Sequence, residues 1–322
     1  MLPDLAEIEA ARARIREVAI RTPLVRLNTE EPLEIYLKLE NLQPIGSFKI
    51  RGAANAMARL SPEALGRGVL TASAGNMAQG VAFCARRLGV PCTVVAPDTA
   101  AAAKIAAIER LGGRVIQVSF DRWWATFESR RFPGVDATFV HAFDDLDVMA
   151  GNGTIGLEIL EDLEAVEAIV VPWGGGGLAC GVGAAVRARK PECRIYAAEV
   201  VTAAPMFAAL AAGEPRIVDY RPSFVDGIGS RTVFPIMFER GRRVLAGSLL
   251  ASLEEVAASV RLLVERNHVV AEGAGACPVA CALSGKAGSS RVVSVVSGGN
   301  IDLERLGSLL DPASHPTSSL PS

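Results

Sequence analysis

Short apolar runs alternate with segments of helical periodicity along this chain, and this alternation constrains the fold more than any other feature. A first series has apolar runs at 68–72, 91–96, 114–118 and 138–142, with helical segments at 76–88, 99–111 and 121–131. A second series has apolar runs at 168–172, 194–199 and 291–297, with helical segments at 152–163, 178–190, 203–212, 252–267 and 275–284. Such alternation is typical of parallel sheets covered by helices. Two series therefore predict two α/β domains.

Three further segments lie outside these series. Residues 4–20 carry apolar side chains at helical spacing, and residues 34–40 alternate apolar and polar side chains as a half-buried strand does. Residues 311–322 are polar and rich in proline, which predicts a mobile tail.

The composition argues against several classes of protein. Charged residues make up 21% of the chain and the net charge is -2, so neither nucleic acid nor an anionic membrane is expected as a partner. Because no apolar run could span a bilayer and the N-terminus lacks the plan of a signal peptide, we expect a cytoplasmic protein. The six cysteines are scattered among apolar neighbours, which predicts reduced thiols.

The stretch Ser47-Phe48-Lys49 is the first candidate for chemistry. Ser47 stands where the N-cap of a helix running to Leu60 is expected. Lys49 would then lie in the first turn, where the helix dipole and burial both favour a neutral amine. A neutral amine can form a Schiff base with a carbonyl. Taken by itself, this stretch is more typical of a surface lysine at the start of a helix.

Glycine-containing turns follow three other predicted strands. The four glycines from Gly174 could let backbone N–H groups converge on a phosphate, although a dinucleotide-binding loop is an alternative. Residues 73–76 offer N–H donors for a carboxylate and the Asn76 amide for a phenolic oxygen, or they form an ordinary loop. Ser297 ends the last strand, where its hydroxyl could bond a ring nitrogen or simply close a turn.

Together these segments supply an amine, a phosphate cradle, a carboxylate clamp and a partner for a ring nitrogen, which is the set that pyridoxal 5'-phosphate needs. The sequence here resembles the fold-type-II pyridoxal-phosphate enzymes, which are tryptophan synthase β-like. Within them it is similar to the threonine/serine dehydratase (ammonia-lyase) and serine racemase group. The resemblance covers about residues 3–310 and rests on motifs in the family's order at 47–52, 73–76, 151–154, 174–178 and 297–300.

The resemblance implies two open parallel-sheet domains with helices on both faces. Residues 1–42 and 146–310 would form a large domain that binds pyridoxal phosphate, and residues 43–145 a small domain inserted into it. The cofactor would sit in the cleft between them, and a homodimer is expected.

The resemblance also implies roles for single residues. Lys49 would be the catalytic residue, because it would hold the cofactor covalently and remove the substrate Cα proton. The other cofactor-binding residues would be Phe48 beside the ring, Asn76 at the 3'-oxygen, Ser297 at the pyridine nitrogen, and Gly174, Gly175, Gly176, Gly177 and Leu178 around the phosphate. The amino-acid substrate would bind Ser73, Ala74, Gly75, Asn76, Met77 and Ser230.

The implied reaction is a β-elimination that converts threonine, serine or a related 3-hydroxy amino acid to a 2-oxo acid and ammonia. The enzyme would thus be a carbon–oxygen lyase of amino-acid metabolism. Racemases of the group carry a serine at the position of Ala74, whose methyl group cannot donate a proton. A serine or aspartate racemase is nevertheless the main alternative, and a non-catalytic nucleotide-binding protein is a more distant one.

Some residues depart from the family's pattern, which leaves the substrate open. Met77 stands where the family usually has histidine, and Trp173 where a small aliphatic residue precedes the glycine loop. Arg122 and Arg231 would be substrate ligands or surface residues. A bulkier or acidic 3-hydroxy amino acid is therefore a further candidate substrate.

A metal site found in some relatives is incomplete here. The site is formed there by two carboxylates and a carbonyl. Glu199 and Ala203 could supply one of each, but Pro205 replaces the second carboxylate. No metal is therefore expected.

Overall fold

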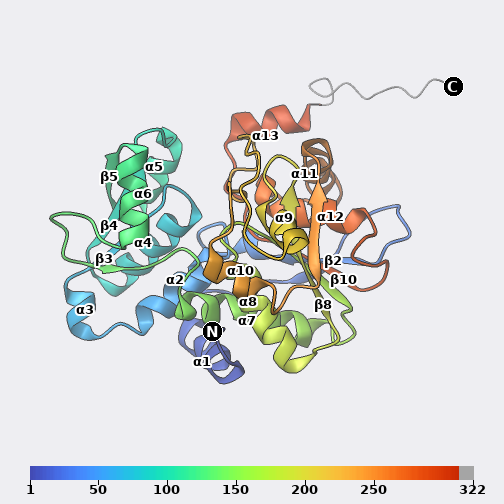
Figure 1. Ribbon diagram of the computed structural model, residues 1–322, viewed down its shortest axis with the longest axis horizontal. Coiled ribbons are helices and arrows are strands. Elements are labelled where there is room, and N and C mark those ends of the chain that lie inside the picture. The colour runs from blue at the N-terminus through green and yellow to red at the C-terminus, as the bar shows by residue number, and fades with distance from the viewer. Residues whose placement is uncertain (312–322) are drawn as a thin grey trace.

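Two largely parallel β-sheets organise the chain (Figure 1), and the computed structural model describes residues 1–311 of it. The larger sheet has the order β1 (Leu24–Arg26), β2 (Ile35–Leu39), β10 (Val292–Val296), β7 (Ala168–Pro172), β8 (Arg194–Val200) and β9 (Gly247–Ala251). The smaller sheet has the order β5 (Arg114–Val118), β4 (Cys92–Pro97), β3 (Val69–Ala72) and β6 (Thr138–Phe139). Only β1 and β2 pair in antiparallel fashion among the described strands. The expected α/β fold is confirmed.

Helices alternate with the strands and cover both sheets. They are α1 (Leu5–Ile15), α2 (Lys49–Ala58), α3 (Pro62–Gly66), α4 (Asn76–Leu88), α5 (Ala102–Arg110), α6 (Phe120–Ser129), α7 (Leu146–Asp162), α8 (Gly177–Arg189), α9 (Pro205–Ala212), α10 (Pro235–Gly241), α11 (Leu253–Asn267), α12 (Gly273–Leu283) and α13 (Leu303–Leu310), with a 3-10 turn, η1, at Glu40–Leu42. None of the helices described could cross a membrane, since none combines the necessary length and apolar character. The predicted mobile tail lies, beyond Asp311, outside the described residues.

The larger sheet is buried on both faces, which explains why its central strands read as continuous apolar runs. Every residue of β7 and β10 is buried. Helices α11 and α12 contribute to the hydrophobic core on one face, and α7, α8 and α10 to the core on the other.

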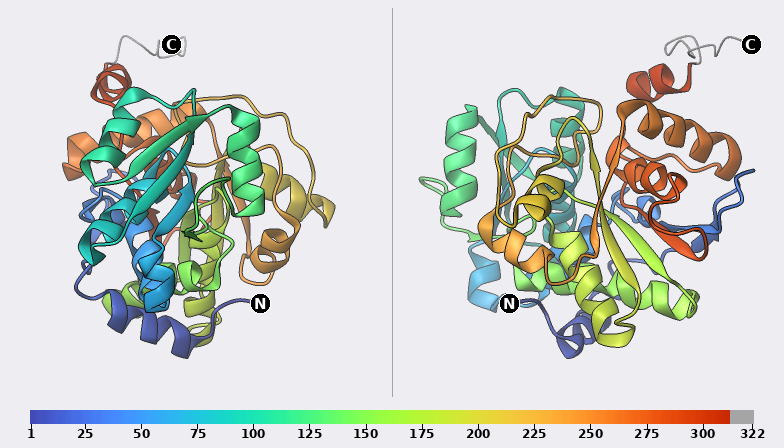
Figure 2. Two further views of the ribbon diagram at one scale, coloured as in Figure 1. Left: turned by 90° about the vertical axis from the view of Figure 1, so that its left-hand side faces the viewer. Right: turned by 45° about the vertical axis from the view of Figure 1, so that its right-hand side comes forward.

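The two sheets occupy different parts of the molecule, and α2 and α7 run between them (Figure 1 and the right-hand view of Figure 2). Helix α2 packs against α4 beside the smaller sheet and against α7, which in turn packs against α8 beside the larger one. Aromatic side chains add a second connection. The rings of Trp124 and Phe127 in α6 lie with centroids 6.0 and 6.2 Å from that of Phe234, just before α10. These contacts determine where the two sheets meet.

A buried ionic network fixes α2 against η1 and α7. Arg51 donates two 2.8 Å hydrogen bonds to the carboxylate of Glu40 and bonds of 2.7 and 2.9 Å to that of Glu158. Lys38 lies 2.7 Å from Glu158 and donates to the Thr22 carbonyl. The four charged residues are at most 4% exposed. Two cations and two carboxylates therefore neutralise one another, with the hydrogen bonds that buried charges require.

The start of α2 differs from the prediction, because Ser47 is not its N-cap. The N-cap position is Phe48, and no side chain caps the helix. Ser47 instead pairs through its backbone with Gly298, and the Phe48 N–H donates to the Ser297 carbonyl. This bridge to the loop after β10 leads the chain into the helix, so that the serine hydroxyl takes no part in capping.

All six cysteines are free and buried, as their apolar neighbours predict. Burial raises the pKa of the Cys84, Cys92 and Cys180 thiols to about 12. Cys277 and Cys281 lie one turn apart in α12 and are part of the core of the larger sheet. The cysteines are therefore packing residues.

Replacing Glu158 by glutamine should lower the free energy of unfolding by about 3 to 5 kcal/mol, because buried Lys38 would lose its nearest carboxylate and buried Arg51 one of its two. Urea unfolding followed by circular dichroism measures the change. Glu161→Gln in the same helix is the matched control, since its carboxylate pairs with Arg12 and Arg21 near the surface. The control should change the free energy by no more than about 1 kcal/mol. Equal effects of the two substitutions would contradict the importance of the network.

Candidate active site

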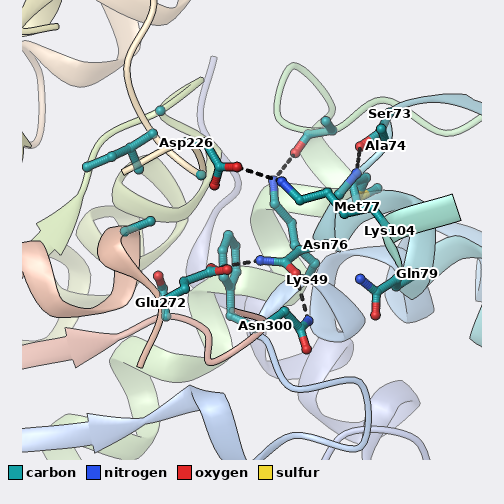
Figure 3. A pocket seen from close by; sticks show the side chains of 18 of the residues that line it. Lys49, Ser73, Ala74, Asn76, Met77, Gln79, Lys104, Asp226, Glu272 and Asn300 are labelled. Atoms are coloured by element: carbon teal, nitrogen blue, oxygen red, sulfur yellow. Dashed lines mark hydrogen bonds and ion pairs between the residues drawn. The ribbon is translucent and has the colours of Figure 1, made fainter. Parts of the chain in front are cut away.

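A cavity of about 550 Å³ opens between the two sheets. It lies where the carboxyl ends of β3, β7 and β10 meet, the position at which open α/β sheets bind ligands. Figure 3 shows side chains that line the cavity. The cavity brings together most of the residues predicted from the sequence, namely Phe48, Lys49, Ser73, Ala74, Gly75, Asn76, Met77, Gly174, Gly175, Gly176, Gly177, Leu178 and Ser297.

Lys49 projects its amine into the cavity from the first turn of α2 (Figure 3). Its Nζ donates a 3.0 Å hydrogen bond to the Ala142 carbonyl and lies 5.0 Å from the centroid of the Phe48 ring. Burial lowers the pKa of Lys49 to about 8, although the carboxyl of Glu272 acts in the opposite direction. The neutral, nucleophilic amine is therefore accessible near physiological pH.

The loop between β3 and α4 offers N–H groups to the cavity. Gly75 occupies the N-cap position of α4, and the first N–H groups of a helix have no partner within it. The Ser73 hydroxyl accepts a 3.2 Å hydrogen bond from the Gly75 N–H, which holds the turn. Ala74 is half-buried beside this turn, whereas Met77 is buried. The arrangement is suited to a small carboxylate.

The glycines after β7 are required because large side chains lie against them. A Cβ on Gly175 would lie 2.0 Å from the Phe143 ring, and one on Gly177 would lie 2.8 Å from the Phe143 backbone. Gly176 has a φ of +87°, and its added Cβ would lie 2.6 Å from the Trp173 ring. The loop thus brings bare backbone to the N-terminus of α8, where unpaired N–H groups and the dipole favour an anion.

Two of the singled-out features serve packing and do not line the cavity. Trp173 is fully buried in the core that α8 and α10 share. The Gly-Asn-Gly-Thr motif lies within α7, where a Cβ on Gly151 would lie 2.3 Å from the Arg51 carbonyl. Thr154 of this motif accepts a 3.0 Å hydrogen bond from Arg51. The motif therefore allows α7 to approach α2.

The cavity also contains a carboxyl that the sequence analysis misses. Glu272, at the N-cap position of α12, accepts a 2.8 Å hydrogen bond from Nδ2 of Asn76. Nδ2 of Asn300 donates to Oδ1 of Asn76 at 2.7 Å and to the Ile45 carbonyl at 2.8 Å. Burial raises the pKa of Glu272 to about 7. The one feature of the sequence that could have pointed to Glu272 is its position directly before the glycine-rich start of a buried helix.

Further lining residues come from segments without a sequence motif. Lys104 of α5 forms a 2.6 Å ion pair with Asp226 across the cavity (Figure 3). Phe143 and Trp123 add aromatic surface to the wall. These residues reach the cavity only through tertiary contacts, so no local sequence pattern predicts that they line it.

Three residues considered for substrate binding are placed elsewhere. Ser230 is not among the residues that line the cavity, and its hydroxyl donates to the Thr232 carbonyl at 2.7 Å. The chain turns just before it at Gly229, whose φ is +93°. Arg231 is exposed. The guanidinium of Arg122 lies over the ring of Phe132, which does not line the cavity.

Glu199 caps a helix. Its carboxylate accepts hydrogen bonds from the N–H groups of Met206 and Phe207 at 2.9 and 2.7 Å, at the start of α9, and from the Ser248 hydroxyl at 2.6 Å. Burial raises the pKa of Glu199 to about 7. Within residues 1–311, no three His, Cys, Asp or Glu side chains are placed to hold a metal ion.

The residues of the cavity fit pyridoxal phosphate. The buried amine of Lys49 suits the aldehyde. The loop at Gly174–Gly177, where added side chains would clash at Gly175, Gly176 and Gly177, suits the phosphate. Asn76 and Ser297 line the same cavity. An amide suits the phenolic oxygen of the cofactor and a hydroxyl suits its ring nitrogen.

Comparisons with known proteins agree with this fit. The family model described as pyridoxal-phosphate dependent enzyme matches residues 15–298. The L-threonine ammonia-lyase of Thermotoga maritima is 40% identical over 314 residues, which cover 95% of this chain and 78% of that protein. The structure of maize serine racemase has a TM-score of 0.89 and 30% identity, with 95% of this chain and 96% of that chain covered. Processed threonine deaminase isoform 2 from Solanum lycopersicum has a TM-score of 0.85 and 32% identity, with 95% and 86% covered. The chain therefore belongs to the family of pyridoxal-phosphate-dependent enzymes.

Proposed function

We propose that this enzyme is a dehydratase (ammonia-lyase) that converts threonine, serine or a related 3-hydroxy amino acid to a 2-oxo acid and ammonia. The observation that carries the proposal is the amine of Lys49, which has a lowered pKa and shares one cavity with the glycine loop. The identity of 40% to an L-threonine ammonia-lyase supports the same reaction.

Some residues of the cavity would bind the cofactor and the substrate, and Lys49 would also transfer a proton. Pyridoxal phosphate, when bound, supplies a carbonyl for the substrate amine and a ring that withdraws electrons from Cα. Lys49 would hold this group covalently and then accept the proton from Cα. The N–H groups of Ala74 and Asn76 would orient the substrate carboxylate, since those of Ser73 and Gly75 already donate to the Val95 carbonyl and the Ser73 hydroxyl. Ser297 is a neutral partner for the ring nitrogen, so it would leave that nitrogen largely unprotonated, which favours prompt elimination.

The overall reaction balances without an oxidant or reductant. The Cα–H bond breaks and its electron pair forms the Cα=Cβ bond, while the hydroxyl leaves Cβ with a proton as water. The freed enamine takes up water and releases ammonia, which gives the 2-oxo acid.

A screen for 2-oxo acid release over the stereoisomers of serine, threonine, 3-hydroxyaspartate and 3-phenylserine tests the proposal. Release from none of them would contradict it.

We also propose the domain limits and the assembly. Residues 43–145 would form the small domain, since all strands of the smaller sheet fall within them, and residues 1–42 and 146–310 the large one. The six buried thiols suit a cytoplasmic enzyme. A homodimer would cover apolar side chains such as Leu42 and Val270, which are 48% and 41% exposed. Light scattering after gel filtration measures the oligomeric state.

Lys49→Ala should abolish covalent attachment of the cofactor and lower turnover at least about 10³-fold, because the other amine of the cavity, that of Lys104, is held in an ion pair with Asp226. Borohydride reduction followed by mass spectrometry detects attachment, and circular dichroism monitors the fold. The matched control is Lys104→Ala, which removes the other lysine that lines the cavity and should leave attachment intact. Normal attachment in Lys49→Ala would refute the assignment.

Because Ala74 has a methyl side chain, we expect elimination from one Cα configuration with negligible racemisation. Its side chain lines the cavity but carries no exchangeable proton, and Lys49 returns a proton only to the face from which it came. Ala74→Ser should introduce some inversion of Cα. Chiral analysis of L-serine and L-threonine incubations, alongside 2-oxo acid release, measures both reactions. If the wild-type enzyme inverts Cα as fast as it releases oxo acid, the racemase alternative replaces the dehydratase.

A further inference from the structure

Three side chains in the wall of the cavity form a directed chain of hydrogen bonds (Figure 3). Asn300 donates to Asn76, and Asn76 donates to Glu272, over distances of 2.7 and 2.8 Å. They come from three separate places, namely the loop after β10, the start of α4 and the start of α12. Asn76 is the central member, and it is the residue expected to contact the phenolic oxygen of the cofactor.

These hydrogen bonds determine which way the Asn76 amide points. Asn300 donates from the same Nδ2 to the Ile45 carbonyl and to Oδ1 of Asn76. Turning the Asn76 amide over would place its NH₂ group against that donor and its oxygen against the oxygen of Glu272, so both contacts would become repulsive. In the observed orientation Nδ2 keeps one hydrogen for Glu272 and one for the cavity.

Glu272 is surrounded by protein on most sides. It is 8% exposed, and its own N–H donates to the Gly298 carbonyl, which ties it to the loop after Ser297. The charged groups that act on it come from other elements: Asp226 from the loop before α10, Lys104 from α5 and Lys49 from α2. In the described chain the hydrogen bond to its carboxyl comes from Asn76.

We propose that Glu272 is a positioning residue that, through Asn76, keeps an amide N–H directed at the phenolic oxygen of the bound cofactor. The inference rests on the role proposed for Asn76, and it does not depend on which amino acid is the substrate. A carboxylate accepts the Asn76 N–H more strongly than a carboxylic acid does. Burial raises the pKa of Glu272 to about 7, so the proton is bound below this pH and lost above it. The surroundings of the phenolic oxygen then change over the same range.

The test is cofactor binding to the apoenzyme, measured by tryptophan fluorescence and by the absorbance of the bound cofactor between pH 5.5 and 8.5. Glu272→Ala should weaken binding about tenfold, since it removes the acceptor from the half-buried amide of Asn76. Glu272→Gln should bind within about threefold of the wild type, because its carbonyl still accepts from Asn76. It should, however, lose the absorbance change near pH 7, since it cannot titrate.

Glu199→Gln is the matched control, because Glu199 is another buried carboxyl with a pKa raised to about 7 but lies outside the cavity. It should leave both the affinity and the pH-dependent absorbance unchanged. Wild-type affinity in Glu272→Ala would overturn the proposal, as would an unaltered pH dependence in Glu272→Gln or an equal loss in Glu199→Gln. Failure to release any 2-oxo acid would instead count against the proposed function alone.

Discussion

The pairing of the buried Arg51 guanidinium with Glu40 and Glu158 is the interaction on which the placement of the reactive amine depends. Arg51 and Lys49 lie in the same turn of α2, so the network that holds one also holds the other. Burial opposes the charged form of Glu40, but Arg51 outweighs it and keeps the pKa of Glu40 below its ordinary value. Apolar residues of equal volume could stabilise the core as well. The planar fork of the guanidinium adds a defined direction, because it is bonded to both carboxylates at once.

The same central helices bring the parts of the site together. Gly151 in α7 permits close contact with α2, and Gly181 in α8 permits close contact with α7. Lys49 at the start of α2 and the glycine loop at the start of α8 are thus brought to one cavity by backbone packing. In this cavity burial lowers the pKa of the Lys49 amine to about 8 and raises that of the Glu272 carboxyl to about 7, so the two values approach each other.

Sequence patterns predicted the fold and most of the candidate residues that line the cavity because those features are local. Continuous apolar runs marked β7 and β10, and glycines marked the strand ends at which side chains are excluded. Strand β9, Gly247–Ala251, was missed because it lacks β-branched residues and aromatic rings. Ser47 was misplaced because its partner Gly298 is distant in the sequence. Glu272 could not be found for the same reason, since its importance arises only where three separate loops converge.

The burial of every cysteine has a practical consequence for studying motion in this enzyme. The thiolate is the reactive form, and thiols whose pKa is raised to about 12, as for Cys84 and Cys180, should react slowly with maleimides. The native cysteines should therefore add little unwanted label in site-directed labelling experiments. A single exposed cysteine introduced beside each sheet would carry a dye without removal of the native thiols. The distance between two dyes would then report how the sheets move when the cavity fills.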